Sequence, residues 1–307
     1  MGARLIALTG ATGFIGRHLL HSLSRRGYRI RVLLRRPVEV PEGASSAVVG
    51  DLARPMNMAA ALAGVDAVVH TAGLGPGMSG RPEDDFRASN TRATQHLAEA
   101  AARARVPRFV FLSSIRAQTG PSAPNPVTEA DAAAPTDAYG RSKYDAEAAL
   151  AGTDLDWVAL RPVLVYGVGA TGNVATLLRL ARSPAPLPLG GLNARRSLVS
   201  VESLAAAVAT VLDAPGPLRR PLIVAEPEPL SVPEMIAALR AGLGRGPGLL
   251  PVPSSLLGLA CWIAGHGDAY ARLSSSLVAR AAGLTDLGWT PAMATRDGLS
   301  AFARGHA

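Results

Sequence analysis

The chain has 307 residues, of which 48% are hydrophobic and 18% are charged, and its formal net charge is +8. This composition excludes an intrinsically disordered chain, and the length allows one large or two modest globular domains. The lone Cys261 excludes a disulfide framework and a cysteine metal site. The six histidines show no metal-ligand spacing, so we expect no metal.

The positive charge is dispersed along the sequence. Arginine pairs stand at 25–26, 35–36, 195–196 and 219–220, and no dense basic block occurs. Because surfaces that bind nucleic acid gather their basic residues, we interpret most of this charge as solvated and expect no nucleic-acid partner. Individual pairs can still bind an anionic ligand.

No targeting or membrane segment is predicted. The first residues, "MGARLIAL", enter a strand-like run without the charged and then apolar segment of a signal peptide. The apolar stretch "SSLLGLACWIAG", at 254–265, is too short to span a bilayer. We therefore expect a cytoplasmic protein without a membrane span.

Short apolar segments alternate with helical patterns through the first two thirds of the chain. Strands are predicted at 4–8, 28–35, 47–52, 66–73, 108–114 and 156–167. Helices are predicted at 14–27, 83–105 and 136–151. This alternation indicates an α/β fold with a Rossmann-type, doubly wound parallel sheet.

The composition changes after Gly167, where proline and glycine become frequent. We expect residues 1–167 to form the dinucleotide-binding domain, with 198–226 returning to it through the strand-like "PLIVAE". Residues 168–197 and 227–307 are predicted to form a smaller, irregular C-terminal lobe that covers a ligand cleft and binds the substrate.

The segment "TGATGFIG", at 9–16, follows the first predicted strand and opens the first predicted helix. Its three glycines allow a tight turn, close approach to a pyrophosphate, and close helix packing, while the helix N-terminus supplies N–H donors. A purely structural turn is the alternative, but this context favours a dinucleotide site. The predicted cofactor contacts here are Gly10, Thr12, Gly13, Phe14, Ile15 and Gly16.

Two later strand ends agree with this site. Asp51 and Leu52 are predicted to flank an adenine ring, and Thr71, Ala72 and Gly73 to approach the middle of the cofactor. Each alone is also consistent with an ordinary turn. Ligands of such sheets bind at the carboxyl ends of strands, where these residues fall.

The end of the second predicted strand bears on the choice of nucleotide. An NAD site places an acidic residue there, whereas this chain has Arg35 and Arg36. Arginine pairs with a 2′-phosphate, so we favour NADP over NAD. A solvated pair at a strand exit is the alternative.

Position 143 holds the only lysine, since the other 30 basic residues are arginine. Tyr139 precedes Lys143 by four residues, so both lie on one face of the predicted helix. A neighbouring ammonium favours the phenolate of a tyrosine, whose ordinary pKa is about 10. The exclusive use of lysine here indicates a requirement that arginine does not meet.

Six segments in order resemble the extended short-chain dehydrogenase/reductase family, in its nucleotide-sugar epimerase and dehydratase branch. They are "TGATGFIG", "DL" at 51–52, "SS" at 113–114, "YGRSK" at 139–143, "RPVLVYG" at 161–167 and "LGWTP" at 287–291. The resemblance covers nearly the whole chain. It implies an NAD(P)-dependent oxidoreductase or epimerase that acts on a nucleotide-diphosphate sugar, as a 4-epimerase or 4-keto reductase.

The resemblance also implies residue roles. Tyr139 moves the substrate proton, Lys143 holds the nicotinamide ribose, and Ser114 binds the reacting oxygen, with Ser113 as the alternative. Asn90 is similar to the asparagine that helps place the active-site helix, although an ordinary helix-interior residue is also consistent. The remaining implied contacts are Pro162 and Val165 for the cofactor, and Arg196 and then Asn173 for the substrate diphosphate.

Other readings remain open. The acid pair of dehydratases is replaced by Ile115-Arg116, which disfavours dehydration. An NADP-dependent reductase of a non-sugar or lipid-linked carbonyl is one alternative, and a non-catalytic nucleotide-sensing or RNA-contacting module is another. Helices near 83–105 and 137–151 often pair across a two-fold axis in this family, so we expect a possible homodimer.

Overall fold

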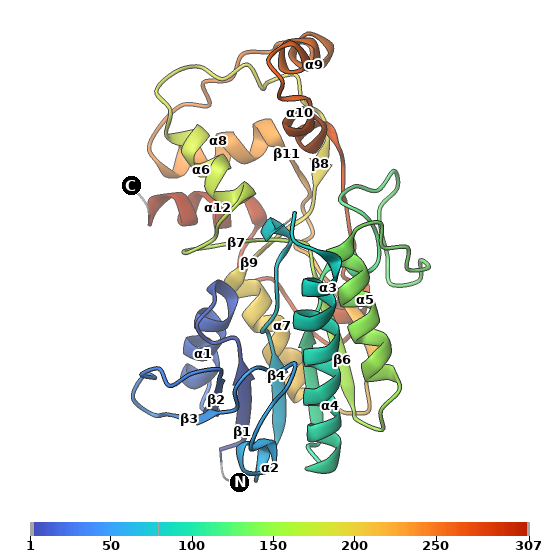
Figure 1. Ribbon diagram of the computed structural model, residues 1–307. Coiled ribbons are helices and arrows are strands. Elements are labelled where there is room, and N and C mark those ends of the chain that lie inside the picture. The colour runs from blue at the N-terminus through green and yellow to red at the C-terminus, as the bar shows by residue number, and fades with distance from the viewer. Residues whose placement is uncertain (1–2, 79, 306–307) are drawn as a thin grey trace.

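The computed structural model of the protein describes residues 3–78 and 80–305. Seven parallel strands form its central sheet in the order β10-β6-β5-β4-β1-β2-β3 (Figure 1). The strands are β1 Leu5–Thr9, β2 Arg29–Leu34, β3 Ala44–Val48, β4 Ala67–His70, β5 Arg108–Leu112, β6 Trp157–Pro162 and β10 Arg220–Val224. The predicted Rossmann-type sheet is confirmed, and β10 joins it beside β6.

Helices cover both faces of this sheet (Figure 1). On one face, α1 (Phe14–Arg25) and α7 (Val201–Asp213) contribute Leu19, Leu23 and Val208 to a buried core. On the other face lie α2 (Met58–Leu62), α4 (Ala93–Arg103) and α5 (Ala138–Ala151). The central strands are buried on both sides, which explains why they read as continuous apolar runs.

A smaller lobe stands over the carboxyl ends of the strands (Figure 1). Its core is shared by α6 (Asn173–Arg182), α8 (Val232–Gly242) and α12 (Thr295–Arg304). Its other elements are β8 Arg195–Arg196, β11 Leu230–Ser231, α9 Ser254–Ile263 and α10 Gly267–Ser274. The connecting elements are β7 Leu164–Tyr166, β9 Leu198–Ser200, α11 Ala282–Asp286, η1 Pro76–Met78, α3 Glu83–Phe86, η2 Arg87–Arg92 and η3 Ile115–Ala117.

Three predicted elements differ most from the observed structure. The third strand is 44–48 and not 47–52, because Gly50 turns the chain with a φ of +72°. The predicted strand 156–167 splits into β6 and β7, and β7 pairs with β9 outside the main sheet. The predicted helix 83–105 contains a π-helical turn at 87–92 between α3 and α4.

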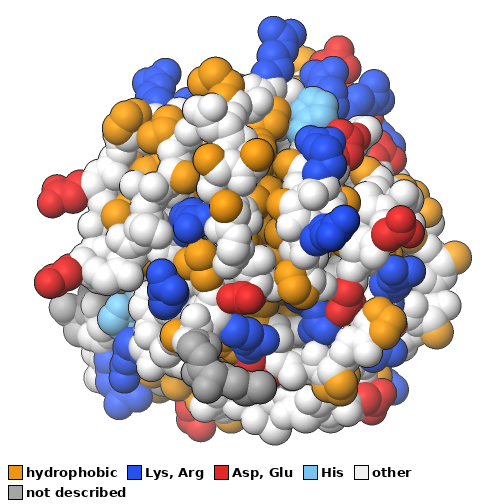
Figure 2. Space-filling model, turned by 90° about the horizontal axis from the view of Figure 1, so that it is seen from below, with side chains coloured by type: hydrophobic (Ala, Val, Ile, Leu, Met, Phe, Trp, Pro, Cys, Tyr) orange, Lys and Arg blue, Asp and Glu red, His pale blue; other side chains and the backbone are white. Residues whose placement is uncertain are grey.

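Charged side chains are mixed over the end of the molecule that carries the N-terminus. Figure 2 shows arginine and acidic side chains interspersed over this face, with no single-sign block. This mixing agrees with a net charge that is mostly solvated. Within the residues that the structure describes, no helix combines the length and apolarity needed to cross a bilayer.

Candidate active site

The glycine turn between β1 and α1 is packed against the carboxyl end of β4. Gly10 has a φ of +71°, and a Cβ atom there would lie 2.6 Å from Thr71 Oγ1 and 2.7 Å from the Ala72 nitrogen. A side chain at Gly16 would overlap the Gly10 carbonyl. Both positions therefore require glycine, because backbone atoms occupy the space that a side chain would need.

The same turn leaves the start of α1 accessible. Thr12 and Gly13 are exposed, and Phe14 and Ile15 are half-buried. The first turn of α1 contains no acidic residue. Free N–H groups and the positive end of a helix dipole attract an anion. The turn at 10–16, called the glycine cradle below, therefore fits the pyrophosphate of a dinucleotide.

A buried histidine joins the ends of β1 and β4. The backbone N–H groups of Thr71 and Ala72 donate to Thr9 Oγ1 at 3.1 and 3.2 Å. The Thr9 hydroxyl is left to donate to His70 Nδ1, at 2.7 Å. This bond holds the Thr71–Gly73 turn against the glycine cradle.

On its other side, His70 reaches the helix that carries Asn90. The Thr94 hydroxyl donates to the Asn90 carbonyl at 2.6 Å, so it accepts from His70 Nε2 at 3.0 Å. These directions require the neutral imidazole with its proton on Nε2. Burial lowers the pKa of His70 to about 3, and the charge of Lys143 adds to this effect, so His70 stays neutral at physiological pH.

Asn90 connects the exit of β4 to α5. It lies in the π-helical turn η2, a distortion that is frequent at functional sites. Its Oδ1 accepts from the Leu74 N–H at 2.9 Å, and its Nδ2 donates to the Leu74 carbonyl at 3.2 Å and to Ser142 Oγ at 2.9 Å. Asn90 is thus in a position to orient α5, and its functional role stays a prediction.

Tyr139 and Ser114 meet at the start of α5. The Tyr139 ring is buried and packs edge-on against Phe86, with ring centroids 6.2 Å apart. Ser114 Oγ accepts the Arg116 N–H at 3.2 Å. Burial raises the pKa of Tyr139, while its hydrogen bond with Ser114 and the charge of Arg116 lower it. The first effect is the largest, so the phenol is protonated.

The expected effect of the Lys143 ammonium on the Tyr139 phenolate stays a prediction. Lys143 Nζ donates to the Leu112 carbonyl at 2.9 Å and lies 4.7 Å from the centre of the Phe111 ring. The ammonium is therefore held against the sheet.

Gly73 lies close to the Lys143 ammonium and limits the space around it. A Cβ atom at Gly73 would lie 3.5 Å from Lys143 Nζ and only 2.5 Å from Asn90 Oδ1. Burial lowers the pKa of Lys143 to about 8, partly offset by the Glu147 carboxylate. The compact ammonium fits this confined position better than a planar guanidinium, which agrees with the lone lysine of the chain.

The ionisation of Lys143 can be measured directly because it is the only lysine. Protein grown with lysine labelled with carbon-13 at Cε gives one lysine resonance, and we expect its titration midpoint near pH 8. The unfolded chain releases this proton near its ordinary value of 10.5. Between these pH values the unfolded state binds more protons, so this group's contribution to the free energy of unfolding rises with pH. A midpoint near 10.5 would contradict the buried position, and Lys143→Arg identifies the resonance by removing it.

Ser113 points into a second buried network. Its hydroxyl donates to the Glu147 carboxylate, which also accepts from Arg161 Nε at 3.0 Å. Arg161 Nη1 donates to Gln118 Oε1 at 2.6 Å. The Ser113 hydroxyl is therefore bound to Glu147 of α5, and Ser114 is the serine that hydrogen-bonds Tyr139.

The predicted nucleotide-selecting residues lie at the carboxyl ends of β2 and β3. Arg35 and Arg36 are exposed, and neither has a hydrogen-bond or ion-pair partner among the described residues. Asp51 is exposed and caps its own turn by accepting the Ala53 N–H at 2.8 Å, and Leu52 is half-buried. Both guanidinium groups are thus available to a phosphate.

The remaining predicted contacts differ in their surroundings. Pro162 is buried at the end of β6, and Val165 is half-buried in β7. Arg196 Nη2 donates to the Arg272 carbonyl at 2.8 Å, and the charge of Arg116 lowers the pKa of Arg196 after the larger effect of burial. Arg116 acts on both Tyr139 and Arg196, so all three share one electrostatic region.

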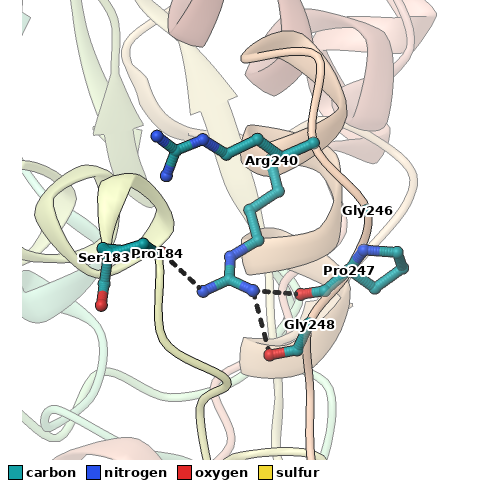
Figure 3. A pocket seen from close by; sticks show the side chains of 7 residues that line it. Ser183, Pro184, Arg240, Gly246, Pro247 and Gly248 are labelled. Carbon is teal, nitrogen blue, oxygen red and sulfur yellow. Dashed lines mark hydrogen bonds between the residues drawn. The ribbon is translucent and has the colours of Figure 1, made fainter.

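Asn173 is exposed at the start of α6, and no hydrogen bond among residues 3–78 and 80–305 joins it to the other predicted residues. The pocket drawn in Figure 3 is a different place, since none of its lining residues is a predicted site residue. The contacts described above bring together Ser114, Tyr139, Lys143, Asn90 and Gly73.

Sequence reasoning missed His70, Glu147 and Arg161. His70 and Arg161 were visible as polar residues within the apolar runs "AVVH" and "VALR". A polar side chain in a buried strand requires partners, and this signal was available. Glu147 had no such signal, because a glutamate on a helix is ordinarily solvated.

The parallel sheet, the glycine cradle and the tyrosine–lysine pair of α5 define a Rossmann-type, NAD(P)-dependent enzyme. Comparison with known proteins agrees. The family described as "NAD dependent epimerase/dehydratase family" matches residues 6–224. The chain belongs to this family, and its fold is that of the extended short-chain dehydrogenases/reductases.

Individual relatives differ in the activities that their names state. A UDP-glucose 4-epimerase from Vibrio cholerae is 32% identical over 310 residues, covering 97% of this chain and 94% of that protein. A ceramide reductase from Caulobacter vibrioides (strain NA1000 / CB15N) is 34% identical over 205 residues, covering 66% of this chain and 59% of that protein. The solved structure "MoeE5 in complex with UDP-glucose and NAD" has a TM-score of 0.74 at 26% identity, with 97% of each chain covered.

Proposed function

We propose that the protein is an NAD(P)-dependent oxidoreductase or epimerase of a nucleotide-diphosphate sugar, of the 4-epimerase or 4-keto reductase type. The observation that carries this proposal is the buried contact of Ser114 with Tyr139, near Lys143. This group lies at the carboxyl ends of the strands, as the glycine cradle does. The near-complete coverage of a relative named UDP-glucose 4-epimerase supports the substrate class.

In this proposal Tyr139 transfers the proton. A bound nicotinamide would supply the hydride acceptor or donor. Because burial raises the pKa of Tyr139, the side chain holds a proton and is ready to act as an acid toward a carbonyl. To act as a base Tyr139 first has to lose that proton, which a nearby positive charge favours.

Three residues position the reaction. Ser114 would hydrogen-bond the same oxygen that exchanges a proton with Tyr139, and Lys143 would hold the cofactor ribose. Asn90 keeps α5 in place through Ser142. Arg116 stands where dehydratases have an acid and is paired with Asp137, so proton transfer to a leaving hydroxyl has no donor at that position.

The cofactor and substrate contacts follow the predicted residues. We propose NADP over NAD, because Arg35 and Arg36 are exposed without ionic partners among the described residues. Arg196 is proposed for the diphosphate, supported by its shared electrostatic region with Arg116. Binding would have to divert its guanidinium from the Arg272 carbonyl and Ser275.

The larger organisation is also proposed. We infer a dinucleotide-binding domain of residues 1–167 with 198–226, and a substrate-binding lobe of 168–197 and 227–307. A cytoplasmic homodimer that pairs α4 and α5 is consistent with Tyr144, which is 41% exposed on α5.

A reductase of a non-sugar or lipid-linked carbonyl is the second candidate. The similarity to a ceramide reductase over 66% of the chain favours it. The same Ser114, Tyr139 and Lys143 would serve that reaction, and only the contacts to the rest of the substrate would differ. This intact group also argues against a non-catalytic nucleotide-sensing or RNA-contacting module.

The test begins with the nucleotide that the purified protein releases on denaturation, identified by mass spectrometry. We expect protein that emerges empty and binds NADPH more tightly than NADH, because two arginines are available to the 2′-phosphate. UDP-glucose is then supplied with each oxidised nucleotide, and products are separated into the C4 epimer and the 4-keto sugar. Stoichiometric bound NAD(H) would contradict the NADP preference and favour an epimerase that keeps its cofactor.

Failure of the sugar assay has a defined meaning. If no UDP-sugar is converted while a long-chain ketone is reduced with NADPH, the second candidate replaces the first. If neither is converted although nucleotide binds, the catalytic proposal itself is wrong.

A further inference from the structure

Helix α9, Ser254–Ile263, is apolar on every side and contains no buried residue. A helix that is hydrophobic all round is ordinarily buried in a core or a membrane. Here Leu256 is 58% exposed, Leu259 54%, Trp262 73% and Ile263 72%. The free energy of such an arrangement in water is unfavourable, because four large side chains stay hydrated.

The exposed residues form a continuous stripe. Leu256, Leu259, Ala260 and Ile263 are spaced i, i+3, i+4 and i+7, so they lie on one face, and all four are exposed. The opposite face packs on α10, where the Tyr270 hydroxyl donates to the Ser254 carbonyl at 2.8 Å. The apolar stripe is therefore turned away from the protein.

The segment is held in this position. α9 lies at the far end of the lobe from the N-terminus (Figure 1). The loop that leads to it is fixed by Arg240, which donates to the carbonyls of Pro247 at 2.9 Å, Gly248 at 3.0 Å and Ser183 at 3.1 Å (Figure 3). The loop that leads to α9 is thus anchored to the rest of the lobe.

We propose that the α9 stripe docks on the surface of an anionic lipid bilayer. Residues 246–267 contain no Asp, Glu, Lys or Arg, so no charge opposes insertion of this segment. Two exposed arginines lie close by in the chain, Arg245 in the loop before α9 and Arg272 on α10, which packs against α9, and both complement anionic headgroups. Trp262 lies next to the end of the helix, and tryptophan is enriched at the membrane interface.

A second copy of the chain fits this surface less well. A helix of ten residues is about 15 Å long, and a single apolar stripe of that length offers far less than the roughly 800 Å² that each partner of a stable protein interface buries. A lipid surface has no such minimum, because each inserted side chain leaves water independently. The lipid contact does not depend on the proposed reaction.

The test uses vesicles of phosphatidylcholine, with and without phosphatidylglycerol. Trp262 is the exposed tryptophan, whereas Trp157 and Trp289 are buried, so its emission reports on insertion. We expect the protein to sediment with the anionic vesicles and its emission to shift to shorter wavelength. The double variant Leu259→Ser/Ile263→Ser should bind about tenfold or more weakly, because two inserted side chains are lost.

The control is Met56→Ser, which removes a 59% exposed side chain elsewhere and should bind like the parent protein. All three proteins carry the same net charge, so general attraction to anionic lipid cannot produce the difference. Near-ultraviolet circular dichroism confirms that each variant is folded. Equal binding by the double variant, or equal binding to both vesicles, would overturn the proposal. Sedimentation equilibrium showing a dimer that Leu259→Ser/Ile263→Ser dissociates would assign the stripe to a second copy instead.

Discussion

Replacing Tyr139 by phenylalanine lowers kcat by about 10²- to 10⁴-fold, the range by which a positioned acid or base accelerates proton transfer. The change removes one hydroxyl and keeps the ring that packs against Phe86. Affinity for the nucleotide should therefore stay unchanged. Steady-state turnover and nucleotide titration, measured on the same preparation, separate the two effects.

The matched control for this experiment lies on the same helix. Tyr144 is 41% exposed on α5, five residues after Tyr139, and Tyr144→Phe should leave kcat unchanged. If Tyr139→Phe retains turnover, the proposed proton transfer is wrong. Loss of nucleotide affinity together with turnover would instead indicate that the hydroxyl supports the fold of the site.

Arg161→Met should lower the free energy of unfolding by about 3–5 kcal/mol, as expected when one partner of a buried ion pair is removed. Arg161 and Glu147 have side chains that are only 6% and 5% exposed. The variant leaves the Glu147 carboxylate with the Ser113 hydroxyl as its remaining hydrogen-bond donor, and it leaves Gln118 Oε1 without its donor. Urea unfolding followed by circular dichroism measures the loss.

An exposed ion pair between α3 and α5, the helix that carries Glu147, supplies the control. Arg141 donates to Glu83 at 2.8 Å, with both side chains more than 40% exposed. Because solvent screens such a pair, Arg141→Met should change stability far less than Arg161→Met. Equal effects of the two substitutions would contradict a network-specific role for Arg161.

Much of the fold could be predicted because it depends on local sequence. The apolar runs and intervening helical patterns are short-range features, and they identified the parallel sheet. The predicted bounds of an element were wrong where pairing with a strand distant in the sequence decides where the element ends. The strand 156–167 divides because its second part, β7, pairs with β9 rather than with the main sheet. No pattern within the segment itself encodes that partner.

The candidate site shows the same division. The spacing of Tyr139 and Lys143 and the glycine turn are readable in the chain, and the structure brings their surroundings together. The choice between Ser113 and Ser114 was not readable, since both follow β5. Glu147 takes the first into its network, and Tyr139 meets the second.

The sequence by itself determined the alternation of strands and helices, the need for glycine at the phosphate cradle, and the unique lysine four residues after Tyr139. Each of these depends on residues within a few positions of one another. Only the tertiary structure decided that Lys143 has a pKa near 8, that His70 is neutral, and that α9 keeps its apolar stripe outside. These properties depend on burial, and burial is created by segments that are distant in the chain.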